Sequence, residues 1–270
     1  MLPRAYKSSI SRYLGSTVSA ISLVRSSSKL PLRSRLCFPR QFKMAQSTAS
    51  AFSLDTPVQR PSTDITLTGN HVTIVGLKAS HASDIFAAMG GPENASLFNY
   101  LWQGPFLREE EVVEQFSKLQ ESKDPVWYAI VSNKTSKAIG YCSLMRIEPQ
   151  HHVVEVGSIS YSPLLQRTVG ATEAMYLLAR YVFEDLGYRR YEWKCDSQNA
   201  PSRRAADRLG FEFEGLFRQH MIVRGKNRDT TWFSMLDREW PEKKTALVNW
   251  LDASNFDEEG IQKRTLQSFR

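Results

Sequence analysis

The chain has 270 residues, 41% of them hydrophobic, with 35 Lys and Arg against 28 Asp and Glu, which suits one sizeable core. Nine of the basic residues and none of the acidic ones lie in residues 1–54, so residues 55–270 carry 26 basic against 28 acidic side chains. A nearly neutral body argues against a nucleic-acid-binding domain. No stretch of the sequence approaches the ~20 apolar residues of a membrane span.

Residues 1–54 form a basic leader with 13 serines and no acidic residue. This composition is typical of a mitochondrial transit peptide and predicts a mitochondrial matrix location for the full-length chain. The alternative is a disordered tail that carries no address. Met44 could also start a shorter, cytosolic form without the leader. Residues 55–70, which contain Pro57, Pro61, Gly69 and Asn70, are expected to link the leader to the folded domain.

The first elements alternate between strand and helix patterns. Residues 71–77 alternate like a strand, and a short helix through Ile85 and Met89 follows, with Ser80 or Ser83 as its cap. A loop rich in aromatic residues leads to a second helix that begins near Arg108. Three acidic residues in its first turn suit the positive end of the helix dipole, and Asp124-Pro125 ends it.

The period then changes to three antiparallel strands at residues 127–131, 138–147 and 153–161. An apolar stripe at helical spacing predicts a long helix over 169–186, which Gly187 ends. A strand at 188–194, a short helix at 202–209 ended by Gly210, and a hairpin of 211–223 and 230–236 across a turn at 224–229 complete the domain. Residues 241–270 are expected to form a helix and a polar tail.

These elements predict an α/β (α+β) fold with a mostly antiparallel sheet, flanking helices and one central βαβ crossover. The strand–loop–helix at residues 160–174 of this crossover stands out chemically. Amides in the first turn of a helix, together with its dipole, bind anions. Thr168 and Thr172 add hydroxyl groups, Arg167 adds a cation, and Gly170 and Ala171 allow close approach. The segment could cradle a diphosphate, and an ordinary capped helix is the alternative.

Four short motifs in this order resemble the GNAT (GCN5-related) N-acetyltransferases, closest to their RimJ/RimL-like branch. They are Gln166-x-x-x-Gly170-Ala171-Thr172-Glu173-Ala174, Tyr181-x-Phe183-x-x-Leu186-Gly187, Asn199-x-x-Ser202, and Leu209-Gly210-Phe211-x-x-x-Gly215. The resemblance covers residues 71–240 and implies a GNAT-type fold. It also implies an acetyl-CoA-dependent N-acetyltransferase, with acetyl-CoA as co-substrate and no metal.

The resemblance also implies where acetyl-CoA binds. The family's Q/R-x-x-G-x-G/A loop aligns with Gln166 at its first position and Ala171 at its last, but Val169 replaces the first Gly, which is displaced to Gly170. Backbone binding is expected from residues 167–172. Free backbone groups of a strand that splays from its parallel neighbour should pair with the pantetheine arm. These expectations make the cofactor site Ser160, Tyr161, Ser162, Gln166, Arg167, Thr168, Val169, Gly170, Ala171, Thr172 and Asn199.

Two catalytic residues are expected for direct attack of an amine on the thioester. Glu155, a carboxylate in an apolar strand, is the candidate base, with a solvent-facing residue or an arginine partner as alternatives and with Asp196 and His220 as rivals. The family's usual Tyr falls on Ala206, so Ser202 is the expected donor to the leaving thiolate, unless it and Asn199 are only helix caps. Arg203 and Arg204 could meet the 3′-phosphate of coenzyme A or face solvent.

Tyr100, Trp102, Phe106 and His220 are expected to form the acceptor pocket, because aromatic rings with polar tips suit an amine. A small-molecule amine is slightly favoured over a protein N-terminus. The alternative function is a catalytically weak acyl-CoA-binding module. Cys37, Cys142 and Cys195 are widely spaced, without metal-ligand spacing or the pattern of a disulfide framework. The acceptor's identity and the oligomeric state stay open.

Overall fold

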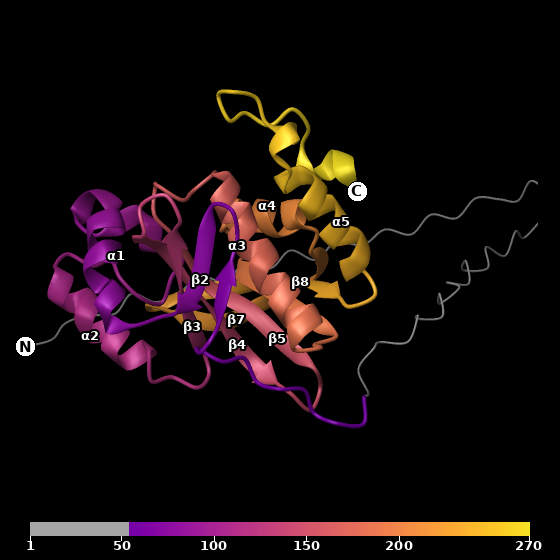
Figure 1. Cartoon of the computed structure of the whole chain (residues 1–270). Coiled ribbons are helices and arrows are strands. Elements are labelled where there is room, and N and C mark those ends of the chain that lie inside the picture. Colours follow the sequence, from indigo (N-terminus) through magenta and orange to yellow (C-terminus); the bar gives the residue numbers. More distant parts are fainter. Residues whose placement is uncertain (1–53) are drawn as a thin grey trace, which may run out of the picture. The chain divides into compact units, whose positions relative to one another are not determined.

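The computed structural model describes residues 54–270, so the expected leader lies outside the described residues except for Leu54. A mixed eight-stranded sheet runs through this part of the chain in the order β1-β2-β3-β4-β5-β6-β8-β7 (Figure 1). All neighbouring pairs are antiparallel except β5 and β6, which confirms the predicted sheet. The strands are β1 (Thr66–Thr68), β2 (Val72–Gly76), β3 (Val126–Ser132), β4 (Ala138–Glu148), β5 (Val153–Tyr161), β6 (Arg190–Asp196), β7 (Glu212–Val223) and β8 (Lys226–Leu236).

Helices cover both faces of the sheet. One apolar core lies between the sheet and helices α3 and α5, and a second lies beneath α1 and α2. Alternate residues of β3 divide between them: Tyr128 and Ile130 enter the first core, and Trp127 and Ala129 the second. The α-helices are α1 (Ala82–Met89), α2 (Glu109–Leu119), α3 (Val169–Arg180), α4 (Ala200–Leu209) and α5 (Trp240–Leu251).

The parallel pair β5–β6 is the feature that positions the site. Its register runs only from Val153–Arg190 to Val156–Trp193. Beyond this point β5 keeps its pairing with β4, and β6 keeps its pairing with β8. Ser158, with φ +50°, lies where the β4–β5 register shifts, and such a bulge re-aims a strand. The two parallel strands therefore separate, as the splayed-strand expectation requires.

Helix α3 is fixed to the other half of the sheet by a buried carboxylate. Glu173 accepts hydrogen bonds from the backbone N–H groups of Asn70 (2.7 Å), His71 (2.7 Å) and Val72 (2.9 Å). Gly170 brings the helix close to β2, since a Cβ at this position would lie 3.0 Å from Val72 Cγ1. The N-terminus of α3 is thus held in place by packing as well as by hydrogen bonds.

Several local expectations need correction. Neither Ser80 nor Ser83 caps α1, because a short 3₁₀ turn precedes it and His81 is its N-cap. The expected linker contains β1, whose Leu67 is buried. Helix α3 is α-helical to Arg180, and a π turn (Tyr181–Asp185) completes the predicted length.

The final hairpin is tighter than predicted, and α5 begins before residue 241. The two hairpin strands are joined by Arg224 and Gly225 alone, both with positive φ, as a type I′ turn requires. Short 3₁₀ turns at Ala253–Asn255 and Leu266–Phe269 follow α5. Within residues 54–270, no helix has the length and apolar character needed to cross a bilayer.

Candidate active site

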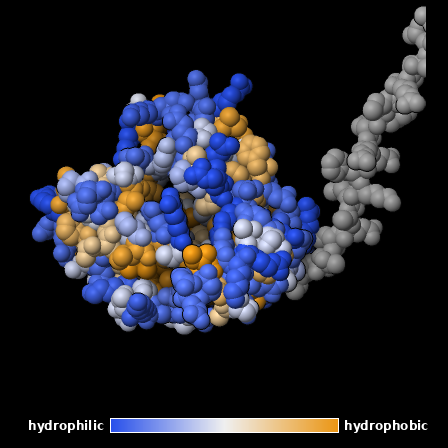
Figure 2. Space-filling view, turned by 90° about the horizontal axis from the view of Figure 1, so that it is seen from above, coloured by the Kyte–Doolittle hydropathy of each residue, from blue (hydrophilic) through white to orange (hydrophobic). Residues whose placement is uncertain are grey.

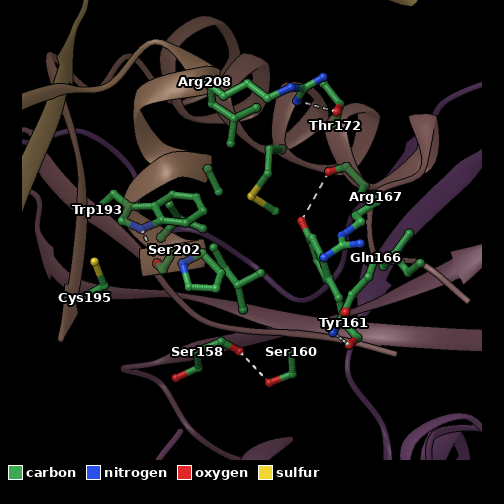
Figure 3. A pocket seen from close by; sticks show the side chains of 18 of the residues that line it. Ser158, Ser160, Tyr161, Gln166, Arg167, Thr172, Trp193, Cys195, Ser202 and Arg208 are labelled. Atoms are coloured by element: carbon green, nitrogen blue, oxygen red, sulfur yellow. Dashed lines mark hydrogen bonds between the residues drawn. The ribbon is translucent and has the colours of Figure 1, made fainter. Parts of the chain in front are cut away.

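A cavity of about 1440 Å³ lies where β5 and β6 separate. Its volume exceeds the roughly 300–1,000 Å³ of common small-ligand sites and suits a long ligand. A hollow is visible in the surface of Figure 2, with both hydrophobic and hydrophilic residues around it. Figure 3 shows side chains of β5 and of the loop before α3 on one side of a pocket, and those of β6 and α4 on the other. Its lining contains seven Lys or Arg and two acidic residues. The acidic residues are Glu155 and Asp196, and the basic ones are Lys134, Arg146, Arg167, Lys194, Arg204, Arg208 and Arg228.

The N-terminus of α3 opens onto this cavity. Thr168 is its N-cap, and its hydroxyl accepts a hydrogen bond from the Ala171 N–H. Arg167, rather than a glycine, has the left-handed backbone in the preceding loop, with φ +61°. Val169 starts the helix and packs partly against the core. All the expected cradle residues from Gln166 to Thr172 line the cavity. The first turn of α3 and the Arg167 side chain can therefore bind an anion in the cavity.

The end of β5 forms one edge of the gap. Ser160 and Tyr161 line the cavity, whereas Ser162 is fully buried and bonds to the Ile139 carbonyl. The carbonyl of Tyr161 already accepts a hydrogen bond from Gln166 Nε2 at 2.9 Å. The Tyr161 hydroxyl donates to the Ala171 carbonyl, tying the strand to α3. Main-chain binding by Ser162 is therefore not supported by its position, because its backbone N–H group also donates to the Ile139 carbonyl of β4.

Glu155 lies in the cavity wall between two cations. Its carboxylate lies 3.0 Å from Arg146 Nε and 3.0 Å from Lys194 Nζ, and only 6% of the side chain is exposed. Burial raises the pKa of Glu155, while Lys194 and Arg146 oppose that rise. Glu155 therefore has the arginine partner that the sequence left open, namely Arg146, and it also lines the cavity.

The two rival bases also line the cavity. His220 is half-buried on β7, and its Nδ1 lies 3.0 Å from the Thr230 hydroxyl. Burial, together with Arg146, Arg228 and Lys194, lowers the pKa of His220, so the ring is neutral near pH 7. Asp196 accepts a hydrogen bond from the Gln198 backbone. It therefore shapes the turn between β6 and α4.

Ser202 and Asn199 divide the roles that the sequence left open. Asn199 is the N-cap of α4, and its Oδ1 accepts from the Ser202 N–H at 3.1 Å. The Ser202 hydroxyl instead accepts a hydrogen bond of 3.0 Å from the indole N–H of Trp193 (Figure 3). Because an indole can only donate, the hydroxyl hydrogen of Ser202 remains available for another acceptor. Both Ser202 and Trp193 line the cavity.

The aromatic loop contributes only part of what was expected. Tyr100 and Trp102 line the cavity, whereas Phe106 is buried in the second core, edge-on to Phe98. The Tyr100 hydroxyl donates to the Gln198 carbonyl at 3.2 Å, and Arg224 at the hairpin tip donates to the Gly104 carbonyl at 2.8 Å. The loop is therefore connected to both sides of the cavity.

Side chains that sequence reasoning missed form the other end of the cavity. Arg208 donates to the Thr172 hydroxyl at 2.9 Å, and its guanidinium lies 4.6 Å from the Trp250 ring centre. Arg204 lines the same cleft, whereas Arg203 bonds to the Ser197 carbonyl. The i, i+4 spacing of Arg204 and Arg208 on a predicted helix was a usable signal. Nothing in the sequence indicated that Phe256 and Ile261 would close this end.

Comparison with known proteins decides the family. The family model described as "Acetyltransferase (GNAT) domain" matches residues 71–212, more than half of the chain. The chain belongs to this family. The GNAT domain implies acetyl-CoA as co-substrate and an acceptor that bears an amine, and the protein is therefore an acyltransferase. The resemblance inferred from the motifs around Gln166 and Asn199 is confirmed.

Solved structures and a curated relative agree with this assignment. A GCN5-related N-acetyltransferase from Brucella melitensis is 46% identical, with a TM-score of 0.77 over 79% of this chain and 97% of its own. A probable GNAT-family acetyltransferase from Chromobacterium violaceum is 34% identical, with a TM-score of 0.65 over 73% and 96%. The uncharacterized N-acetyltransferase p20 of Bacillus licheniformis is 26% identical over 164 residues, which is 55% of this chain and 90% of the relative.

Proposed function

We propose that this GNAT protein transfers the acetyl group of acetyl-CoA to the primary amine of a small molecule, by direct attack within a ternary complex. The observation that carries the proposal is the gap between β5 and β6, which joins the N-terminus of α3 to Glu155 within one cavity. One substrate can enter along the gap and the other can approach from the side of Glu155. Two substrates can therefore be held at the same time.

The residues at the helical end suit a coenzyme that carries a diphosphate and a phosphate. First-turn amides of α3 and the Arg167 side chain face the cavity at this point, and both attract phosphate oxygens. Arg204 and Arg208 add cations farther along α4. Acetyl-CoA supplies the activated acetyl thioester. Ser160 and Tyr161 on β5 are proposed to flank its pantetheine arm, as an added strand would pair.

Glu155 and Ser202 are the proposed catalytic residues. The amine nitrogen forms a bond to the acetyl carbon, the carbon–sulfur bond breaks, and one amine proton passes to the Glu155 carboxylate. The raised pKa of Glu155 brings this carboxyl group closer to the useful range of a general base. The Ser202 hydroxyl, oriented by Trp193, donates its proton to the departing sulfur, which is released as the free thiol. The proton held by Glu155 then passes to solvent, and solvent restores the Ser202 hydroxyl.

The connected aromatic loop favours a compact acceptor. Hydrogen bonds from Tyr100 to Gln198 and from Arg224 to Gly104 tie the loop to the α4 and hairpin sides of the cavity. A protein N-terminus would have to enter past these contacts, whereas a small amine would not. This argument supports the small-molecule preference.

A thiol-release assay with acetyl-CoA and a panel of amines tests the proposal. We expect thiol release that depends on the amine, with intersecting lines in double-reciprocal plots of initial velocity. The Cys195→Ala variant should give the same pattern, since direct attack needs no acetyl-enzyme. Cys195 serves as the test because it is the cysteine among the residues that line the cavity. Coenzyme A binding without amine-dependent release would favour a weak binding module. Parallel lines with an acetylated Cys195 would contradict direct attack.

We also propose that the full-length chain is delivered to the mitochondrial matrix, with a shorter cytosolic form starting at Met44. The support is the composition of residues 1–54, with nine basic and no acidic residues. A fluorescent fusion of residues 1–54 should enter mitochondria, and a matched fusion with four of its arginines replaced by glutamate should not. Absence of mitochondrial fluorescence from the unmodified fusion would refute the proposal.

A further inference from the structure

The acceptor end of the cavity has an excess of positive charge. Arg146, Lys194 and Arg228 all lie near His220 and lower its pKa. Two of them, Arg146 and Lys194, are paired with the buried Glu155 carboxylate. Lys194 Nζ also lies 2.6 Å from Glu192 Oε2, and Glu192 is a buried residue of β6. The negative charge near this end is therefore largely committed to these two cations.

Arg228 differs from the other two cations. It is half-buried on β8, lines the cavity, and has no acidic partner among residues 54–270. Its Nε donates to the Thr230 hydroxyl at 3.2 Å. The same hydroxyl lies 3.0 Å from His220 Nδ1, so it can accept from Arg228 and donate to the neutral ring. Thr230 thus holds the inner edge of the guanidinium and leaves its terminal nitrogens for a ligand.

We propose that Arg228 binds an anionic group of the acceptor, so that the substrate class is a small primary amine that carries a carboxylate or a phosphate. This inference rests on the proposed function and specifies its acceptor. The planar guanidinium fork matches both carboxylate and phosphate oxygens in a bidentate arrangement. The amine of such a molecule would lie toward Glu155 while its anionic group lies on Arg228.

The same charges act on the reacting amine. Neighbouring cations disfavour an ammonium ion and lower its pKa, which increases the fraction of neutral amine that direct attack needs. They also oppose polyamines, whose second ammonium group would meet an unpaired Arg228. An acceptor with its own anionic group neutralises Arg228 and avoids this penalty. The site therefore discriminates by charge as well as by size.

Pairs of amines that differ by one anionic group test the inference. Glycine is compared with glycinamide, and phosphoethanolamine with ethanolamine, by kcat/KM in the thiol-release assay. We expect one anionic member to be preferred by at least tenfold, and the preferred pair identifies carboxylate or phosphate. Arg228→Met should reduce this preference to below threefold without changing KM for acetyl-CoA, and Arg228→Lys should retain part of it. Arg218→Met, an exposed arginine of β7 outside this cavity, is the matched control.

A binding measurement separates this inference from the proposed function. Protein saturated with coenzyme A is titrated with N-acetylglycine and N-acetylglycinamide. A second titration compares N-acetylphosphoethanolamine with N-acetylethanolamine. Tighter binding of an acid than of its neutral partner, lost in Arg228→Met, supports the anion site even if turnover is absent. Equal affinity or no binding within both pairs overturns it, as does a variant that weakens charged and neutral members equally. Absence of thiol release with every amine would refute the transferase proposal alone.

Discussion

Glu155 and His220 could both act as the base, and burial shifts their pKa values toward each other. Burial raises the pKa of Glu155, and burial with nearby cations lowers that of His220. A base works only when deprotonated, so either residue would make kcat/KM fall as pH decreases through its own pKa. The pH profile alone therefore does not identify the base, whereas variants do.

We predict that Glu155→Gln lowers kcat by about 100-fold or more and removes the acidic limb of the kcat/KM profile. The amide keeps the shape of the side chain but cannot accept the amine proton. Affinity for acetyl-CoA should change little. In His220→Asn the acidic limb should remain. An acidic limb that persists in Glu155→Gln and disappears in His220→Asn would transfer the role of base to the histidine.

At Ser202, a catalytic role can be tested separately from a role in capping α4. Since Asn199 and not Ser202 provides the side-chain cap of α4, Ser202→Ala should lower kcat by about 100-fold with little loss of helix stability. Trp193→Phe removes the indole N–H that orients the hydroxyl, together with part of a buried ring, and roughly a tenfold loss of kcat is expected. Asn199→Ala should instead cost about 1 kcal/mol in the free energy of unfolding. Equal rates for wild type and Ser202→Ala would leave this serine without a catalytic role.

At the scale of elements, the placement of α3 depends on one carboxylate. We predict that Glu173→Gln lowers the free energy of unfolding by about 2–3 kcal/mol, because an amide cannot accept all three backbone N–H groups and turns its own NH2 group toward at least one of them. For a body of this size the melting temperature should fall by about 5–10 °C. Glu114→Gln is the control, since Glu114 makes an exposed pair with Lys118 alone and should change stability by under ~0.5 kcal/mol. Similar melting temperatures for both variants would argue against the anchor.

Elements with a clear period were predictable from the sequence. The stripe through Met175, Leu178 and Val182 placed α3, and the change of period placed β3 to β5, because burial of one face dictates those patterns. The turn of the final hairpin was not, since the polar run before Thr230 resembled a loop while the backbone turned at Arg224 and Gly225. That error moved Arg228 from a strand to a turn and concealed its place in the cavity.

The candidate site was predictable where local backbone chemistry defines it. The strand–loop–helix at Gln166–Thr172 carries its own signal, and the lining of the cavity includes all of it. Contacts between distant segments were not accessible, because no local pattern tells which face of a strand a charge meets. Lys194 beneath Glu155 and Trp193 beside Ser202 are examples. Phe106 and Ser162 were predicted to line the site, Phe106 for its ring and Ser162 for its backbone. In the structure Phe106 packs in the second core and Ser162 bonds to the Ile139 carbonyl of β4.

Across the whole molecule, the net charge conceals how charges are distributed. Residues 55–270 carry 26 basic and 28 acidic side chains, yet the cavity is lined by seven basic and two acidic ones. The near-neutral total of residues 55–270 argues against a nucleic-acid-binding domain, but it does not describe the cavity, whose lining is mostly basic. Charges of one sign within a concave site concentrate ligands of the opposite sign.

The salt dependence of coenzyme recognition should report this distribution. We predict that KM for acetyl-CoA rises about three- to tenfold between 50 and 500 mM NaCl, because the Debye length falls from about 14 Å to about 4 Å, while KM for neutral S-acetylpantetheine stays constant. Since Arg208 lies at the far end of the cleft beside Thr172 and Trp250, Arg208→Gln should weaken the dependence for acetyl-CoA and leave acetylpantetheine unaffected. The exposed Arg218→Met variant should behave like wild type. Equal salt dependence of the two thioesters would mean that these cations do not act on the phosphates, and the diphosphate site would have to lie elsewhere.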